Sequence, residues 1–331
     1  MRMKNLITEH LDIWTSAKAP KSNGGRGNTS TNGQTIYGIK KLRELILELA
    51  VRGKLVPQDP NDLPANELLK KITKEKERLL KEGKIKKQKP LPEIGEGEKP
   101  FDLPKGWQFA RLNDFGDWGA GATPLRNNFI YYNGSIPWFK SGELESDFIS
   151  ESEEHITELA LRETSLRYNT IGDVLIAMYG ATIGKVSILQ VRATTNQAVC
   201  ACTPFNGIYN LYLLTLLKAY KNRFIEMGAG GAQPNISREK IIATVVPLPP
   251  LNEQHRIVAK VDELMALCDQ LEKQETENTE THQTLVKTLL STLTSAADHK
   301  EFKETWNRIK EHFDILFTTE ESIDQLKQTI L

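Results

Sequence analysis

The segment Gly180-Ala-Thr-Ile-Gly-Lys185 contains the residue types of a phosphate-binding loop. Such a loop needs four residues between its glycines and a Ser or Thr after the lysine to hold magnesium. Here three residues separate the glycines and Val186 follows the lysine, so the spacing excludes a nucleotide site of this class. Two interpretations remain for Tyr179, Thr182 and Lys185. They either flank a turn whose backbone amides approach a nucleic-acid phosphate, or belong to a plain hairpin turn with a solvated lysine.

A second Gly-rich segment, 228–238, carries side chains that suit the edges of nucleic-acid bases. Gln and Asn can pair bidentately with adenine, and Arg with guanine or with phosphate. The alternative is an ordinary loop in which Asn235 or Ser237 caps a short helix that begins at Arg238. Both interpretations can hold for different residues. The candidates are Gly231, Gln233, Asn235, Ser237 and Arg238.

Two further polar groups complete the set of candidate contacts. Lys140, Ser141 and Glu143 follow Trp138 on an expected strand-to-loop turn. A carboxylate there could accept a hydrogen bond from cytosine N4, although such residues more often stabilise a turn or a cap. The other group is Thr195, Asn196 and Gln197.

The composition gives no global attraction to a polyanion. The 331 residues include 43 basic and 43 acidic side chains, so the formal net charge is zero and any nucleic-acid contact must come from local charge. No run of residues approaches the length of a membrane span, and the amino-terminal sequence is too polar for a secretory signal. We therefore expect a cytoplasmic protein without membrane contact.

The first hundred residues predict helices around a loop. The cluster 16–35 is rich in Gly, Ser, Asn and Thr and predicts a mobile loop, whereas apolar residues between Ile39 and Leu49 recur at helical spacing. A second helix is expected after Pro64. Between residues 70 and 89 there are ten Lys or Arg and three Glu, which indicates either a solvated helix face or a phosphate-binding surface. Residues 90–104 are rich in Pro, Gly and Glu and predict a linker.

Residues 101–250 predict one α+β domain. Short β-rich runs lie at 173–179, 186–189, 198–202 and 241–246, and one helix is expected from about residue 209 to 227. The fold class is therefore α+β, with a globular mixed α/β domain attached to long coiled-coil-like spacer helices.

A heptad pattern follows from Asn252 to about Leu293 and predicts a helix roughly 60 Å long. A polar interval at Glu275, Asn278 and His282 interrupts it. An apolar seam of this kind needs a helical partner, so we expect either two copies to associate through residues 257–290 or the chain's own terminal helices to cover it. The seam residues are Ile257, Val261, Leu264, Cys268, Leu271, Leu285 and Leu289.

The two ends of the chain resemble each other. Residues 311–315 repeat the pattern of residues 9–13, and residues 323–331 repeat that of residues 39–47. The offsets are 302 and 284, so the early copy carries 18 extra residues, which fall within the 16–35 loop. We expect four regions: 1–100, 101–250, 251–295, and 296–331 as the start of a second repeat. The chain would then be a fragment, or a truncated product, of a longer two-cycle protein.

Several stretches together resemble the specificity subunits of Type I restriction-modification systems. In order along the chain they are Leu103-Pro-Lys-Gly-Trp107, Gly121-Ala-Thr-Pro124, 136–144, 172–185, Thr195-Asn-Gln197 and 247–257. The resemblance implies a target-recognition domain that reads one half of a bipartite double-stranded DNA site. It also implies that methyltransferase subunits dock on this chain and that restriction subunits join through them. S-adenosylmethionine, ATP and magnesium are then expected on those partners and no cofactor on this chain.

No catalytic set emerges from the sequence. An adenine methyltransferase needs a Gly-rich cofactor loop and an Asn-Pro-Pro-aromatic motif, and Pro247-Leu-Pro-Pro is not one. The six histidines are scattered, and Cys200, Cys202 and Cys268 are interpreted as small buried hydrophobes without a metal-site spacing. We therefore expect a non-catalytic DNA-reading subunit. The alternatives are a coiled-coil scaffold that binds only proteins and a free-standing enzyme.

Overall fold

A computed structural model describes residues 13–14, 32–229 and 234–330 of the chain, in two compact units. One unit comprises the described residues up to Ile46 together with Asp262–Leu331, and the other comprises Leu47–Val261. The predicted 16–35 loop lies outside the described residues except for its last four, which begin helix α3 (Asn32–Val51). Helix α9 (Leu251–Thr294) confirms the predicted long helix.

The predicted domain boundary near residue 100 is wrong, because residues 47–100 belong to the same unit as the β-rich region. The buried guanidinium of Arg111 binds the predicted linker through the Pro92 carbonyl (3.0 Å) and the Glu98 carboxylate (3.1 Å). Helix α4 (Ala65–Lys81), which confirms the helix expected after Pro64, buries Leu68. Gly207 has φ +96°, a backbone conformation that residues with a Cβ rarely adopt, and a Cβ there would lie 2.2 Å from Leu68 Cδ1, so both the backbone and this contact favour glycine.

The described part of the β-rich unit contains three sheets. The five-stranded sheet has the order β2-β9-β6-β7-β4, with β4 and β7 parallel and the other neighbours antiparallel. A three-stranded sheet has the order β5-β3-β8, and β1 pairs with β10. The strands are β1 (Gln108–Arg111), β2 (Gly116–Ala120), β3 (Tyr132–Phe139), β4 (Phe148–Ile149), β5 (His155–Ile156), β6 (Val174–Ala177), β7 (Val186–Leu189), β8 (Thr194–Thr195), β9 (Val199–Pro204) and β10 (Val245–Leu248).

Strands β6 and β7 are buried at every position, which explains why they read in the sequence as continuous rather than alternating apolar runs. Helix α6 packs against both strands. The short helices of this unit are α5 (Glu158–Glu163), α6 (Asn210–Ala219), α7 (Lys221–Gly228) and α8 (Arg238–Ala243), and the 3-10 turns are η1 (Glu96–Glu98), η2 (Leu112–Asp114), η3 (Phe129–Tyr131), η4 (Ser141–Glu143) and η5 (Gly180–Thr182). The α+β fold class is thereby confirmed.

Two sequence predictions within this unit are wrong in detail. The helix expected over 209–227 is two helices, because Tyr220 leaves the helical conformation at φ −89° and ψ 3° and caps both. The strand expected over 241–246 begins only at Val245, because Ile241 and Ile242 belong to α8, where both are buried. Burial in the tertiary structure here overrides the β-propensity of Ile.

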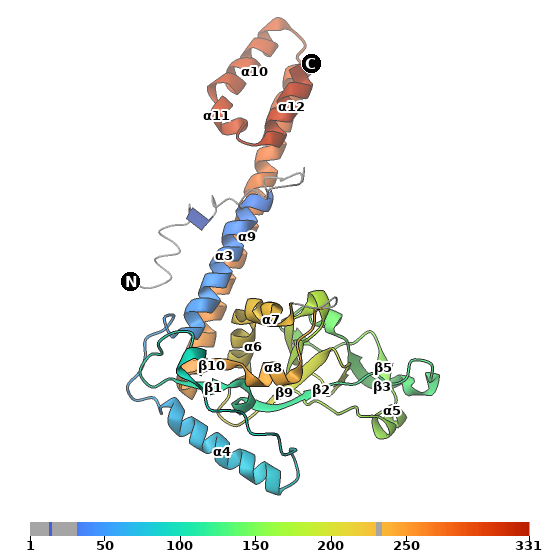
Figure 1. Cartoon of the computed structure of the whole chain (residues 1–331). Coiled ribbons are helices and arrows are strands. Elements are labelled where there is room, and N and C mark those ends of the chain that lie inside the picture. The colour runs from blue at the N-terminus through green and yellow to red at the C-terminus, as the bar shows by residue number, and fades with distance from the viewer. Residues whose placement is uncertain (1–12, 15–31, 230–233, 331) are drawn as a thin grey trace. The chain divides into compact units, whose positions relative to one another are not determined.

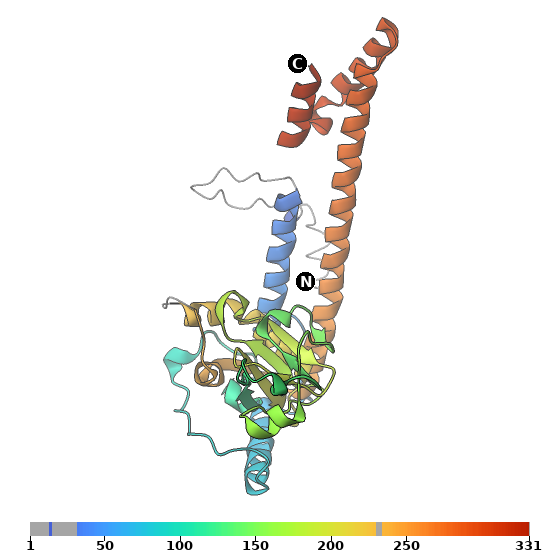
Figure 2. The same ribbon diagram turned by 90° about the vertical axis from the view of Figure 1, so that its right-hand side faces the viewer.

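The other unit is entirely helical in its described part. Figures 1 and 2 show α3 beside α9, and Arg43 of α3 pairs with Asp269 (2.6 Å) and Glu272 (2.9 Å) of α9. Farther along α9, Val286, Leu290 and Leu293 form a buried cluster with residues of the last three helices. Those helices are α10 (His299–Glu311), α11 (Phe313–Leu316) and α12 (Glu320–Ile330). The chain's own helices thus contribute to covering the seam, which is the second of the two predicted arrangements.

The seam itself changes register along α9. Leu264, Cys268 and Leu271 are buried as predicted, as are Ile257 and Val261 in the other unit. Leu285 is 49% exposed and Leu289 only partly buried, so the prediction for Leu285 is wrong. A straight helix drifts about 20° per heptad relative to a 3.5-residue repeat. Four heptads separate Ile257 from Leu285, and the buried face therefore moves on by nearly one residue, to Val286.

Among the described helices, none combines the length and the hydropathy that crossing a lipid bilayer requires.

Candidate nucleic-acid interface

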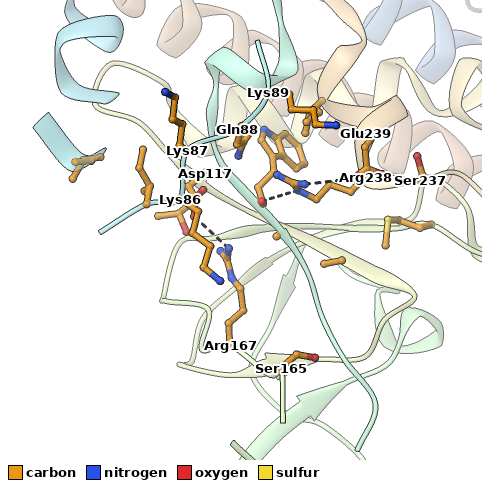
Figure 3. Close-up of a pocket in the computed structure, with 18 of the residues that line it drawn as sticks. Lys86, Lys87, Gln88, Lys89, Asp117, Ser165, Arg167, Ser237, Arg238 and Glu239 are labelled. Atoms are coloured by element: carbon orange, nitrogen blue, oxygen red, sulfur yellow. Dashed lines mark hydrogen bonds and ion pairs between the residues drawn. The ribbon is translucent and has the colours of Figure 1, made fainter. Parts of the chain in front are cut away.

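A groove of about 1800 Å³ lies on the β-rich unit (Figure 3). One wall is the extended segment from residue 84 to 91, which follows α4, and the other includes β2, the residues after α5, and the start of α8. Six cationic side chains line it against three carboxylates, so the local charge is positive although the chain is neutral. The cations are Lys84, Lys86, Lys87, Lys89, Arg167 and Arg238, and the carboxylates are Glu75, Asp117 and Glu239.

The two arginines of the groove are held in place by the fold. Arg238 Nε donates to the Trp118 carbonyl (2.9 Å), and its Nη1 lies 3.4 Å from Glu239. Arg167 pairs with Asp117 (3.3 Å). Both side chains remain partly exposed, so they present pre-positioned charge to the groove. Arg238 was a predicted contact, whereas Arg167 was not, because an isolated arginine carries no sequence signal.

Two loops that are far apart in the sequence meet at this groove. Tyr179 and Asn235 form an isolated β-bridge, supported by Gly180 N to the Pro234 carbonyl (2.8 Å). Both Tyr179 and Asn235 are exposed, and Tyr179 lines the groove. The structure thus brings together residues of the two predicted Gly-rich segments.

Ser237 has the helix-capping role that was one of its two predicted alternatives. Its hydroxyl accepts a hydrogen bond from Lys240 N (3.3 Å) at the start of α8, which begins at Arg238. Ser237 is also exposed on the groove. The predicted candidates Gly231 and Gln233 lie outside the described residues.

The segment Gly180–Lys185 forms the hairpin turn between β6 and β7. Gly180 adopts φ +60° and the Thr182 hydroxyl donates to the Tyr179 carbonyl (2.7 Å), which tightens the turn. Lys185 lies 3.4 Å from Glu145 and does not line the groove. The hairpin interpretation therefore describes the backbone of this segment, and of its candidates only Tyr179 faces the groove.

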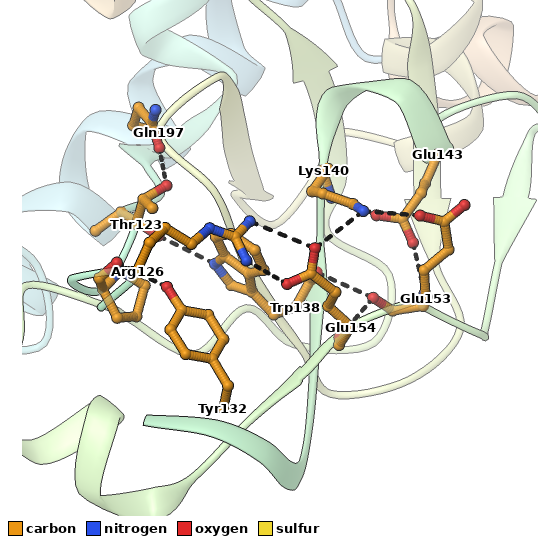
Figure 4. A network of polar contacts seen from close by, with 12 residues as sticks. Thr123, Arg126, Tyr132, Trp138, Lys140, Glu143, Glu153, Glu154 and Gln197 are labelled. Carbon is orange, nitrogen blue, oxygen red and sulfur yellow. Dashed lines mark hydrogen bonds and ion pairs between the residues drawn. The ribbon is translucent and has the colours of Figure 1, made fainter. Parts of the chain in front are cut away.

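Thr195 is buried in the fold, and Asn196 stabilises a local turn. Thr195 is 1% exposed, so the prediction that it contacts DNA is wrong. Asn196 Oδ1 accepts from Ala198 N (3.1 Å) and Asn196 N donates to the Phe139 carbonyl (2.9 Å), an arrangement that fixes the local turn. The neighbouring Gln197 is exposed and lines the groove, and its Oε1 accepts a hydrogen bond from the Thr123 hydroxyl (Figure 4).

Lys140 and Glu143 lie in the network of polar contacts drawn in Figure 4, and Ser141 begins the 3-10 turn η4 that follows β3. The Glu143 carboxylate accepts from Lys140 N (2.6 Å) and Glu153 N (2.8 Å), so both of its oxygens are used by the backbone. Lys140 Nζ donates to Glu153 (2.7 Å) and Glu154 (3.1 Å), and the bond to Glu153 raises the pKa of Lys140. For Glu143 the turn interpretation, rather than base contact, fits this geometry.

Arg126 extends this network to Trp138, and Trp138 connects two of the recognised sequence stretches. The Arg126 guanidinium lies 4.7 Å from the ring centre of Trp138 and pairs with Glu154. Trp138 Nε1 in turn donates to the Ala122 carbonyl (3.0 Å). The hydrogen bond from Trp138 to Ala122 therefore joins the stretches Gly121–Pro124 and Ile136–Leu144.

No cluster of three or more His, Cys, Asp or Glu side chains suited to a metal ion occurs in the part of the chain that the structure describes. The three cysteines are buried thiols as interpreted, and burial raises the pKa of Cys200 to about 12. These thiols therefore stay protonated near neutral pH.

Comparison with known proteins gives consistent matches. The model of the family described as Type I restriction modification DNA specificity domain matches residues 104–281. The chain is 42% identical to the Type I restriction enzyme EcoAI specificity subunit of Escherichia coli, over 100% of this chain and 57% of that protein. It is also 42% identical to the EcoEI specificity subunit of Escherichia coli, over 100% of this chain and 56% of that protein.

Among solved structures, the crystal structure of the HsdS subunit from Thermoanaerobacter tengcongensis is similar with a TM-score of 0.45. It is 19% identical and covers 82% of this chain and 62% of that one. The chain thus spans a little more than half the length of the curated relatives it matches. On the family match and the two whole-chain identities, the chain belongs to the Type I restriction modification DNA specificity domain family.

Proposed function

We propose that this chain recognises double-stranded DNA sequence as the specificity component of a Type I restriction-modification assembly. The family membership supports this role, and the observation that carries it to particular residues is the cation-lined groove on the matched domain. A neutral protein gains local attraction for DNA only through such a concentration of positive charge.

Within the groove, polar side chains would contact base edges and cations would contact phosphates. Tyr179 and Gln197 line the groove, and Asn235, which does not line it, forms a β-bridge with Tyr179. All three are exposed and end in hydrogen-bonding groups, and the amides suit adenine in the major groove of DNA. Arg238, held by the Trp118 carbonyl, suits guanine or a phosphate. One recognition domain would read one half of a bipartite target.

The chemistry would belong to partner subunits. Methyltransferase subunits would dock on this chain and bring in restriction subunits, and those partners would bind S-adenosylmethionine, ATP and magnesium. We place the assembly in the cytoplasm, where it would meet duplex DNA. The second candidate function is a coiled-coil scaffold without DNA specificity, which the pairing of α3 with α9 favours.

Selection from a library of randomised duplexes separates the two functions. The purified chain is incubated with the library, alone and with its methyltransferase subunit, and bound duplexes are sequenced. We expect one enriched half-site motif. Binding of the methyltransferase without enrichment of any sequence would support the scaffold and overturn the proposal.

A pair of glutamine variants refines this test. Gln197→Ala should relax the motif at one position, since a bidentate base contact is worth about 1–3 kcal/mol of discrimination. Gln190→Ala is the matched control, because Gln190 is exposed on the same unit but does not line the groove. An identical motif from both variants would remove Gln197 from the reading surface.

A further inference from the structure

Four lysines line the groove although they lie outside the matched DNA specificity domain at 104–281. They are Lys84, Lys86, Lys87 and Lys89, here called the lysine strap. We propose that the lysine strap contacts the sugar-phosphate backbone of the duplex in that groove and supplies affinity independent of sequence. This inference rests on the proposed DNA-reading function. It adds a second element to the interface, beside the recognition domain itself.

The strap lysines are mostly unpaired. All four are exposed, and among the residues that the structure describes only Lys84 of the four has an ion-pair partner, Glu82 at 2.8 Å. Within the described residues, no carboxylate pairs with Lys86, Lys87 or Lys89. Several cations of the preceding helix differ in this respect, since Lys70 pairs with Glu67 (2.7 Å). The strap therefore has positive charge available for an external anion.

The opposite wall of the groove also presents cations. Figure 3 draws Arg167 and Arg238 around the same space as Lys86, Lys87 and Lys89, and all of them line the groove. Two cationic walls facing one space repel each other, and an anion between them would relieve that repulsion.

The dimensions favour a polymer over a small anion. Pockets for small molecules usually measure about 300–1,000 Å³, whereas this groove measures about 1800 Å³. Five residue steps separate Lys84 from Lys89, which corresponds to at most about 18 Å of extended chain. One DNA strand places a phosphate every 3.4 Å along its axis, so the strap can reach several consecutive phosphates.

Salt dependence tests the inference, because each phosphate contact to B-DNA contributes about 0.9 to the slope of log K against log salt. The full chain is titrated by fluorescence anisotropy with a labelled 30-base-pair duplex of random sequence, from low to moderate NaCl. The test variant replaces all four strap lysines with Gln. We expect the salt dependence of this variant to be weaker, with the magnitude of the slope smaller by about 2 to 4. Its affinity for the duplex near 0.1 M NaCl should drop at least about tenfold.

Two further variants isolate the cause. Replacing the strap lysines with Arg keeps the charge and should keep the slope. The matched control replaces four exposed lysines of α4 that do not line the groove with Gln, and its slope should change by less than about 1. Those lysines are Lys70, Lys71, Lys74 and Lys81. The half-site motif selected by the strap variant should equal that of the unaltered chain, because phosphate contacts carry no base information.

Two results would overturn the inference, and they are distinguishable. If the unaltered chain binds duplexes and the strap and α4 variants lose slope equally, the lysine strap has no specific role while the proposed function stands. If the unaltered chain binds no duplex even at low salt, the proposed function and the strap inference both fall.

Discussion

Replacement of Glu143 by Ala distinguishes a residue that builds the interface from one that reads a base. Its carboxylate accepts two backbone hydrogen bonds, from Lys140 (2.6 Å) and Glu153 (2.8 Å). Hydrogen bonds to charged groups contribute about 1.5–3 kcal/mol each when buried. Because Glu143 is partly exposed, we expect Glu143→Ala to lower the free energy of unfolding by roughly 2 kcal/mol in total.

For a unit of this size, 1 kcal/mol corresponds to a Tm change of about 2–4 °C, so Glu143→Ala should lower Tm by about 4–8 °C. The assay is thermal unfolding followed by circular dichroism, together with half-site selection below the transition. Glu145→Ala is the control, since that carboxylate has only an exposed contact to Lys185 at 3.4 Å and should cost less than about 0.5 kcal/mol. An unchanged Tm with an altered motif would refute the turn role and favour base contact by Glu143.

Three further predictions concern stability. Leu285→Ala should change the free energy of unfolding by less than about 0.5 kcal/mol, because Leu285 is exposed. Val286→Ala should lower the free energy of unfolding by roughly 2 kcal/mol, because Val286 is buried. Urea unfolding of both variants checks that the buried face of α9 has moved to Val286. The hydrogen bond from Arg256 (2.6 Å) lowers the pKa of Asp62 below its unfolded value, so this pair stabilises the fold above about pH 4 and the stabilisation is lost as pH falls through the lowered pKa. Asp62→Asn should therefore lower Tm at pH 7 by an amount that shrinks toward pH 3.5, and a difference independent of pH would contradict this assignment. Ser237→Ala should cost about 1 kcal/mol through loss of the α8 cap, measured by urea unfolding, and a neutral result would remove the capping role.

The element types of the β-rich domain were predictable where burial and local pattern agree. Strands β6 and β7 read directly from continuous apolar runs, and α9 from its heptads. The membership of residues 47–100 in the same unit was not predictable, because it depends on long-range contacts such as Arg111 with Glu98 and Leu68 beside Gly207. The register change at Leu285 follows from helix geometry, which a fixed heptad count does not include.

The segments that form the candidate site were predictable from the sequence, but which of their residues line the groove was not. Tyr179, Gln197 and Arg238 were all predicted contacts and line the groove: Tyr179 adjoins the Gly-rich segment 180–185, Gln197 belongs to the polar group 195–197, and Arg238 ends the Gly-rich segment 228–238 and begins α8. Thr195 had the same polar character in the sequence and yet is buried, since the pairing of β8 with β3 is not encoded locally. The lysines after α4 had a clear charge signal, but only the folded chain brings them to the same groove as Arg167.

Site-specific photocrosslinking determines whether the groove on the β-rich unit holds DNA, as we propose. A benzophenone amino acid is placed at Tyr179, which lines the groove, or at Ile171, which is 70% exposed on the same unit outside it. After irradiation with a labelled duplex, we predict a crosslink from position 179 that unlabelled selected duplex competes away, and little or none from position 171. Equal crosslinking from both positions, or none from position 179 under conditions where the duplex is bound, would show that the groove does not hold DNA.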